Sequence, residues 1–131
     1  MSIQSNRITK LENLDNLENL EELYIAHNGL TKIEGLEKNT KLTTLDVAGN
    51  QITVVENVSH LHELEEFWAN GNQIQDINHI DRQLGPQHAP KLNTVYLERN
   101  PAQRKEGAAY RRKLIYALPQ VRQIDATMAR A

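Results

Sequence analysis

The stretch LEEFWANGNQIQDI, residues 64–77, decides the fold, because its pattern of apolar residues and asparagine recurs along the chain. Copies of it are LEELYIAHNGLTKI (20–33), LTTLDVAGNQITVV (42–55) and the shorter LNTVYLERN (92–100). They share the form L-x-x-L-x-L-x-x-N-x-I-x-x-I. The asparagines at equivalent positions are Asn6, Asn28, Asn50, Asn72 and Asn100, with steps of 22, 22, 22 and 28 residues. A fixed period of this length indicates a solenoid of stacked repeats.

This pattern is typical of the leucine-rich repeat, and it predicts an α/β solenoid: a horseshoe with a parallel concave sheet and a C-terminal helical cap. The L-x-L alternation predicts short strands with both apolar residues facing inward. These inward residues are Leu23, Ile25, Leu45, Val47, Phe67, Ala69, Val95 and Leu97. Each repeated asparagine follows a strand, where we expect its amide to bind polar backbone groups of neighbouring turns. The I-x-x-I run after it favours a 3₁₀-like or irregular return.

We expect two regions, with residues 1–99 forming the repeats and residues 100–131 forming the cap. The first repeat is truncated, since Ile3 and Asn6 match the end of a strand and Met1 its first inward position. Because solenoids need polar caps, we expect the chain to be the C-terminal part of something longer. Its first strand should be frayed or covered by another chain, and this uncapped end could also pair with a second copy.

Two other segments depart from the repeat. The third copy is six residues longer, and its RQLGPQHAPK segment (82–91) predicts a loop on the return side because of its two prolines and glycine. After Asn100, Pro101 interrupts the repeat, and a helix is predicted that Pro119 ends. Its apolar face consists of Tyr110, Leu114, Ala117 and Leu118. The basic residues 111–113 lie largely off that face, and Val121 and Ile124 should return to the core.

Composition excludes several classes of function. The 131 residues are 39% hydrophobic and 24% charged, include no cysteine, and contain no apolar run near the ~20 residues of a membrane span. Residues 1–98 carry 7 Lys/Arg and 15 Asp/Glu, a balance of −8, whereas residues 99–131 carry 8 and 2, a balance of +6. This asymmetry suggests either two solvated surfaces or an acidic body for a basic partner.

The five histidines lack further metal ligands nearby, and no phosphate loop or triad stands out, so we expect no metal, no cofactor and no enzyme activity.

The outward strand positions are the better place to look for function. They are Glu22, Tyr24 and Ala26; Thr44, Asp46 and Ala48; Glu66, Trp68 and Asn70; and Thr94, Tyr96 and Glu98. The central column therefore holds three aromatic residues and one acid, where the pattern predicts side chains facing water. Either the aromatics stack as cross-strand pairs, or a partner protein covers them, since Tyr and Trp are favoured interface anchors. The adjacent carboxylates favour a partner with Lys or Arg. A patch of roughly 400 Å² is half of a standard interface side, so binding should be weaker than for a longer horseshoe.

Four stretches also carry a resemblance to a known family. SNRITKLENLDNLENLEELYIAHNG, LEEFWANGNQ, TVYLERNPAQ and YRRKLIYALPQVRQIDAT closely resemble the leucine-rich-repeat regulatory subunits of protein phosphatase 1, of the type called regulatory subunit seven. The resemblance implies a non-catalytic protein whose concave face binds and regulates the phosphatase catalytic subunit. It implies that Glu66, Trp68 and Tyr96 contact the phosphatase. The further partner-binding residues in and beside that column are Asp46, Tyr24, Glu22 and Glu98.

The same resemblance implies residence in the nucleus and cytoplasm, a role in chromosome segregation, and ternary complexes with a small phosphatase inhibitor. We expect no direct contact with nucleic acid and none with membranes. Two alternatives remain open. One is a spliceosomal leucine-rich-repeat scaffold similar to the A-prime protein of the U2 particle, whose basic cap would suit such a role, although the acidic face would repel RNA phosphates. The other is a purely structural fragment that packs against another chain.

Overall fold

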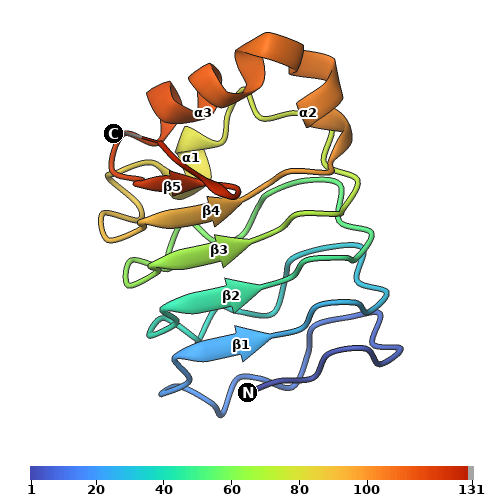
Figure 1. Cartoon of the computed structure of the whole chain (residues 1–131). Helices are drawn as coiled ribbons and strands as arrows, with labels where there is room; N and C mark the ends of the chain where they lie inside the picture. Colours follow the sequence, from blue (N-terminus) through green and yellow to red (C-terminus); the bar gives the residue numbers. More distant parts are fainter. Residues whose placement is uncertain (130–131) are drawn as a thin grey trace.

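The repeats form a coil of stacked turns with one sheet along one side (Figure 1). A computed structural model describes residues 1–129 of the chain. Its four main strands are β1 (Glu22–Tyr24), β2 (Thr44–Asp46), β3 (Glu66–Trp68) and β4 (Thr94–Tyr96), which are parallel and in register. Residues 1–3 add one β-bridge, Ser2 to Tyr24, which is less than the strand that a complete repeat would supply.

The core lies between this sheet and the return segments, as the two-residue alternation predicts. All eight inward strand residues are at most 1% exposed, and Phe67 is the largest of the fully buried side chains. The apolar residues of the returns complete one continuous cluster with them, among them Leu30, Ile33, Ile52 and Ile74. A strand of only three residues has too few hydrogen bonds to be stable alone, so burial across the stack is what holds each strand in place.

An asparagine ladder satisfies the polar backbone where the chain turns into the core. The Oδ1 atom of Asn50 accepts hydrogen bonds from the backbone N–H groups of Asn28 and Leu30, both at 3.1 Å. Its Nδ2 group donates to the carbonyl oxygens of Ile25 at 3.1 Å and Val47 at 2.8 Å. Asn28, Asn72 and Asn100 repeat this arrangement. Asn6 differs: it is exposed, and its side chain donates only to the carbonyl of Gln4.

A left-handed residue stands directly before each ladder asparagine. These residues are Ser5, His27, Gly49, Gly71 and Arg99, with φ angles of 57°, 59°, 68°, 70° and 62°. Three of the five have a side chain, although this backbone region favours glycine. At Gly49 glycine is also needed for space, because a Cβ atom there would lie 2.4 Å from Nδ1 of His27.

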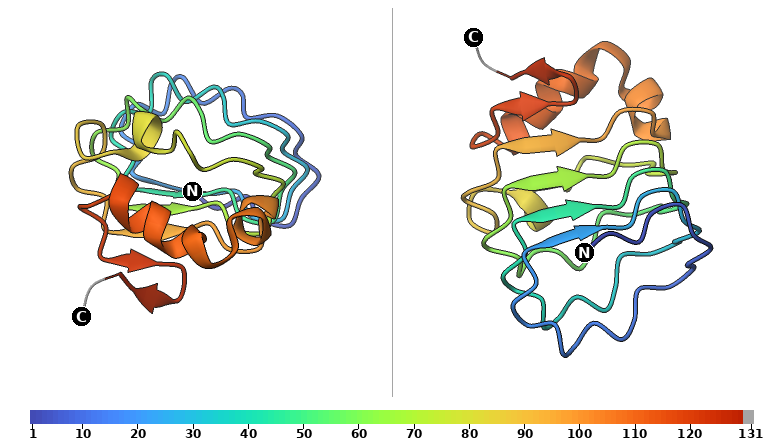
Figure 2. Two further views of the ribbon diagram at one scale, coloured as in Figure 1. Left: turned by 90° about the horizontal axis from the view of Figure 1, so that it is seen from above. Right: turned by 60° about the horizontal axis from the view of Figure 1, so that its bottom comes forward.

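The return side is mostly irregular, but the long third repeat contains a short helix. Residues 81–84 form α1 (Asp81–Leu84), so the prediction of a loop across 82–91 is wrong for its first residues. Leu84 is fully buried, and its burial beneath the return explains why a turn of helix forms there. The view along the stack shows α1 on the far side of the coil from the sheet (Figure 2).

The terminal segment, residues 100–129, closes the top of the stack. It contains α2 (Pro101–Glu106), a 3₁₀ turn (Gly107–Ala109) and α3 (Tyr110–Ala117), followed by β5 (Gln123–Ile124) and β6 (Thr127–Met128). β5 extends the sheet parallel to β4, and β6 pairs with β5 in the antiparallel direction. Proline is well placed at the first residue of α2. The predicted apolar face is confirmed at Tyr110, Leu114 and Leu118, which are buried over the last repeat, whereas Ala117 is half-buried.

The helices of residues 1–129 are all too short or too polar to cross a lipid bilayer.

Candidate protein-binding face

The four residues of the predicted column lie side by side on the sheet. The strand register aligns Tyr24 with Asp46, Asp46 with Trp68, and Trp68 with Tyr96. Because adjacent strands are ~4.8 Å apart, the column extends over roughly 15 Å. All four side chains are half-buried rather than inside the core, so the indole of Trp68 is not sealed in the hydrophobic interior.

Two of the aromatic residues stack on each other. The ring centroids of Trp68 and Tyr96 are 4.2 Å apart with an interplanar angle of 21°. Such a pair is worth about 0.5–1.5 kcal/mol beyond the area it buries. Cross-strand stacking therefore accounts for part of why Trp68 stands at this position. One face of the indole is used in this way, and the residue nevertheless keeps some exposure to solvent.

Carboxylates hold the polar ends of two column residues. The hydroxyl of Tyr24 donates to Oε1 of Glu22 at 2.8 Å, and Nε1 of Trp68 donates to Oε1 of Glu66 at 3.3 Å. In each pair the partners are two residues apart in one strand, so both point to the same face. The hydrogen bond to the Glu22 carboxylate raises the pKa of the Tyr24 hydroxyl above its usual value. The face thus presents aromatic rings whose orientation is fixed before any partner arrives, which lowers the entropy cost of binding.

Asp46 is the acid within the column. Burial raises the pKa of its carboxyl above the usual value, against the opposing effects of the Ala48 N–H group, which donates to it at 3.0 Å, and of nearby His27. No Lys or Arg pairs with Asp46 within the described chain, residues 1–129. A basic side chain from outside could therefore supply a countercharge that the protein itself does not.

Three positions predicted to line the concave face are buried instead. Ala26, Thr44 and Ala48 are 2%, 8% and 7% exposed. Their side chains are small, so larger neighbours on adjacent strands cover them. The exposed surface is consequently narrower than the sequence predicts and is concentrated in the central column with Glu22, Glu66 and Glu98, of which Glu22 is exposed and the other two are half-buried.

One contributor to the face was not predicted from the sequence. Nε2 of Gln123, from β5, donates to the hydroxyl of Tyr96 at 2.8 Å. The repeat motif gives no signal for this residue, because β5 belongs to the terminal segment and carries only the inward Ile124 of the L-x-L pattern. The column is therefore held at one end by a residue outside the repeats.

Two of the histidines contact backbone carbonyl groups away from the strands. His60 Nε2 lies 2.9 Å from the carbonyl oxygen of Leu36, and His62 Nδ1 lies 2.7 Å from that of His88. Across residues 1–129, no three His, Asp or Glu side chains come together as a metal site would require. The concave face itself presents oriented aromatic rings beside acidic groups.

Comparison with known proteins agrees with this architecture. The family model described as Leucine Rich repeats (2 copies) matches residues 1–38 and 40–82, which is more than half of the chain. The chain is 67% identical over 42 residues to protein phosphatase 1 regulatory subunit 7 of Xenopus tropicalis and 62% identical over 42 residues to that of Homo sapiens. It is 58% identical over 38 residues to protein phosphatase 1 regulatory subunit SDS22 of Schizosaccharomyces pombe. These matches cover 32%, 32% and 29% of this chain but only 12%, 11% and 11% of the relatives.

Solved structures share the whole fold. The crystal structure of the Drosophila melanogaster SNF/U2A' complex matches 97% of this chain and 72% of the chain compared, with a TM-score of 0.83 and 25% identity. A leucine-rich-repeat protein of Leptospira interrogans matches 95% of this chain and 30% of its own, with a TM-score of 0.77 and 21% identity. The predicted solenoid is thereby confirmed. The chain belongs to the leucine-rich-repeat family, and over about a third of its length it is similar to regulatory subunits of protein phosphatase 1.

Proposed function

We propose that this chain is a non-catalytic regulator that binds the catalytic subunit of protein phosphatase 1 through its concave face. The observation that carries the proposal is the register column of three aromatic residues and Asp46, beside carboxylates that no Lys or Arg pairs among residues 1–129, on a chain similar to phosphatase regulatory subunits. Glu66, Trp68 and Tyr96 would form its centre. Tyr24, Asp46, Glu22 and Glu98 would surround them, and basic side chains of the phosphatase would meet the carboxylates.

The size of the surface sets the expected affinity. Three outward residues on each of four strands give a patch well below the ~800 Å² that a partner usually contributes to a stable complex. The burial of Ala26, Thr44 and Ala48 reduces it further. We therefore expect weak binding by these residues alone and tighter binding by a protein with more repeats of the same kind.

The test is capture of purified phosphatase catalytic subunit by the immobilised chain. Trp68→Ala and Glu66→Lys should each reduce capture by at least about tenfold, since central aromatic anchors and buried charge contacts are often worth 2 kcal/mol or more. Two matched controls lie outside the face: Val54→Ala removes an exposed apolar side chain, and Glu37→Lys reverses an exposed acid on the return side. Both should leave capture unchanged. Equal capture by all five proteins would refute the proposal.

The structural likeness to the SNF/U2A' complex supports a second candidate, a spliceosomal leucine-rich-repeat scaffold. Under that function the unmodified chain would not retain phosphatase at all and would instead copurify with spliceosomal proteins. Mass spectrometry of complexes isolated from cell extract separates the two. It also tests two further parts of the proposal, a small phosphatase inhibitor in the same complex and residence in both nucleus and cytoplasm, when the fractions are analysed separately.

A further inference from the structure

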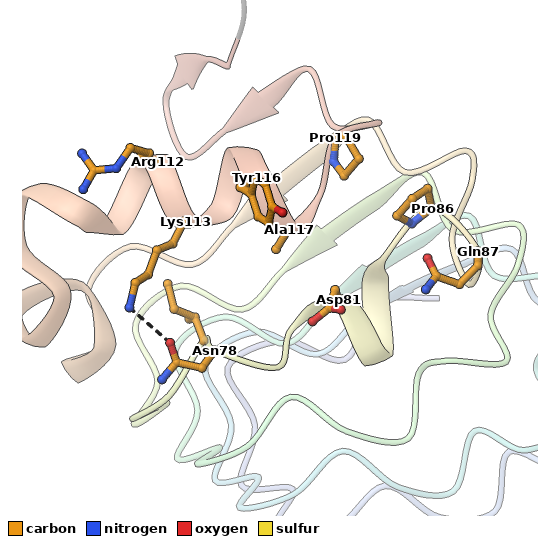
Figure 3. Close-up of a pocket in the computed structure, with 10 residues that line it drawn as sticks. Asn78, Asp81, Pro86, Gln87, Arg112, Lys113, Tyr116, Ala117 and Pro119 are labelled. Carbon is orange, nitrogen blue, oxygen red and sulfur yellow. Dashed lines mark hydrogen bonds between the residues drawn. The ribbon is translucent and has the colours of Figure 1, made fainter.

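A groove away from the sheet separates the terminal segment from the long third repeat (Figure 3). Its volume is about 750 Å³, within the range of sites that hold small ligands or short peptide segments. One wall is the outer side of α3 together with Pro119, just beyond its end. The other is the return segment with α1 and the loop behind it. None of its ten lining residues belongs to a strand, so it is distinct from the concave face.

The walls of this groove present apolar side chains among the polar ones. Tyr116 is 89% exposed and extends from α3 over the hollow. Pro86 and Pro119, both exposed, belong to opposite walls, and the buried Ile77 belongs to the return wall. A tyrosine ring with prolines nearby is the kind of surface on which an extended, proline-containing segment packs. A ring so fully exposed contributes nothing to the stability of the fold, so its presence is not explained by packing.

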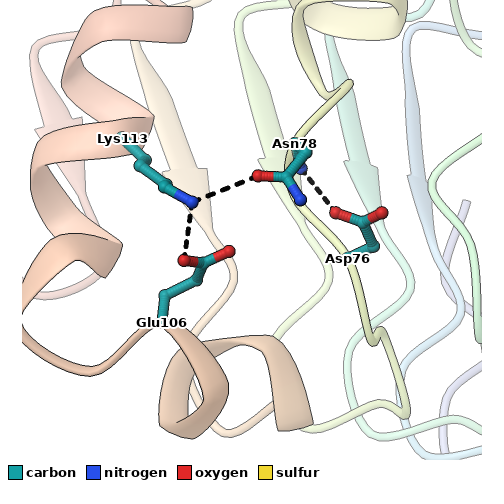
Figure 4. A network of polar contacts seen from close by, with 4 residues as sticks. All are labelled: Asp76, Asn78, Glu106 and Lys113. Atoms are coloured by element: carbon teal, nitrogen blue, oxygen red, sulfur yellow. Dashed lines mark hydrogen bonds and ion pairs between the residues drawn. The ribbon is translucent and has the colours of Figure 1, made fainter.

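The charges at the groove are unevenly balanced. Nζ of Lys113 is held by Oε1 of Glu106 at 2.7 Å and Oδ1 of Asn78 at 3.2 Å, and the N–H group of Asn78 donates to Asp76 at 2.7 Å (Figure 4). Lys113 is thus fixed in place with its charge matched. Arg112 beside it is exposed and has no carboxylate within 4 Å among the residues that the structure describes.

We propose that this groove binds an extended segment of a partner protein that carries a glutamate or aspartate next to proline or aliphatic residues. The guanidinium of Arg112 would take the carboxylate in a bidentate pair. Tyr116 and the two prolines would pack against the apolar residues. The net charge of +6 over residues 99–131 would attract such a segment, whereas the acidic body of the chain, at −8, would repel it from the concave face.

The same features argue against other occupants. Nucleic acid would need several unmatched cations along a track, but of the ten lining residues only Arg112 is a cation without a paired carboxylate. A second copy of the chain would need a surface of about 20–30 residues on each side, and ten residues line this one. A short acidic peptide fits both the volume and the charge.

The test is a titration of the ¹⁵N-labelled 131-residue chain with an N-acetylated octapeptide built of glutamate, leucine and proline, followed by amide chemical shifts. We expect saturable shifts at Asn78, Gln87, Lys113 and Ala117, and none in β1–β4. A matched peptide with lysine in place of glutamate should cause none. Arg112→Ala and Tyr116→Ser should each weaken binding about tenfold, which is the loss of one charge-assisted contact or one aromatic anchor. Both side chains are exposed, so both variants should fold normally.

Arg104→Ala is the matched control, because it removes an exposed cation of α2 outside the groove. Unchanged affinity in this variant, with loss in the other two, supports the proposal. Equal weakening in all three would mean general attraction to a basic surface and would overturn it. Absence of shifts, shifts confined to the sheet, shifts that appear with the lysine peptide, or tighter binding of a single-stranded oligonucleotide to the groove would overturn it as well.

Discussion

In both the repeat stack and the terminal segment, side chains satisfy buried backbone groups, but the residue types differ. In the repeats, the oxygen of an asparagine amide accepts hydrogen bonds from two backbone N–H groups of one turn. Its nitrogen donates to carbonyl oxygens that follow or end the strands. In the terminal segment Asp125, which directly follows β5 and is not at the ladder position, serves other backbone groups: its Oδ1 accepts from the N–H groups of Leu97 at 2.7 Å and Glu98 at 2.9 Å. Its Oδ2 accepts from the Tyr110 hydroxyl at 2.8 Å.

The difference lies in how accepting and donating are divided between side chains. In an internal turn one asparagine amide does both. At the end of the stack Asp125, whose carboxylate accepts only, serves N–H groups, and Arg111 donates to the carbonyl oxygens of Ile124 at 3.0 Å, Thr127 at 3.0 Å and Met128. The cost of burying the charge of Asp125, at 8% exposure, is offset by three hydrogen bonds.

The largest expected effect is on the ladder. Asn72→Ala leaves the N–H groups of Asn50 and Ile52 and the carbonyl groups of Val47 and Ala69 without their partner. We expect a loss of about 4 kcal/mol in the free energy of unfolding, since several buried polar groups are orphaned together. Urea denaturation measures it. Asn6→Ala, at the exposed first position, is the comparison and should cost under about 0.5 kcal/mol. Similar losses in both would show that the ladder is not what stabilises the stack.

The terminal segment should respond to a cavity. Leu114 of α3 is fully buried, and Leu114→Ala should lower the free energy of unfolding by about 3 kcal/mol. Because residues of α3 and of the repeats belong to one core cluster, we expect one cooperative transition in circular dichroism and tryptophan fluorescence. Two separate transitions, with only the helical signal shifted, would mean that the two regions unfold independently.

Removal of the Tyr110 hydroxyl tests the polar side of the terminal segment. Tyr110→Phe should cost about 1.5 kcal/mol at pH 7, because Asp125 loses one of its three donors. Burial, together with the carboxylate of Asp125, raises the pKa of Tyr110 well above its usual 10.0. The unfolded chain therefore loses this proton first, and stability should fall as pH rises above about 10. That part of the alkaline loss should be absent in Tyr110→Phe. An identical pH profile in both proteins would contradict the assignment.

The smallest effect is expected at Asp46, a half-buried carboxylate of the repeats that pairs with no Lys or Arg among residues 1–129. Its pKa is raised by burial, so the folded state favours its neutral form, and this stabilisation is present at acid pH and lost as pH rises through its pKa. Asp46→Asn keeps an acceptor for the Ala48 N–H group and removes the charge. We expect a gain of under about 1 kcal/mol at pH 7 that vanishes near pH 3, measured by thermal unfolding at both pH values. A loss of stability at pH 7 would show that the charge is compensated within the fold.

The repeated features of this chain could be predicted because each occurs several times at one spacing. The inward strand residues and the asparagines of the internal turns follow from the 22-residue period. The apolar face of α3 follows from the spacing of apolar residues in a helix. Single features carried no such signal. Asn39 is buried and donates to the carbonyl groups of Leu14 and Leu17, but the next equivalent position is Leu61. Gly107, with a φ angle of 57°, splits the predicted helix in two.

The concave face was predictable in its outline and not in its detail. The column follows from strand register, but whether Trp68 stacks on Tyr96 depends on side-chain rotamers that spacing does not determine. The burial of Thr44 depends in the same way on how large its neighbours are. Asp125 was missed for another reason: it is a single acidic residue outside the 22-residue spacing, 25 residues after Asn100 and beyond two helices, so no motif indicates it.

The stacking of these turns also has a mechanical consequence. Residue 1 and the terminal segment lie at opposite ends of the coil, and the backbone hydrogen bonds between strands run along the line that joins them (Figure 1). Tension applied to the two ends would load these bonds one rung after another instead of all together. We expect the protein to yield at low force in steps of about 22 residues, beginning at residues 1–8, which one β-bridge and a few backbone hydrogen bonds join to the next turn.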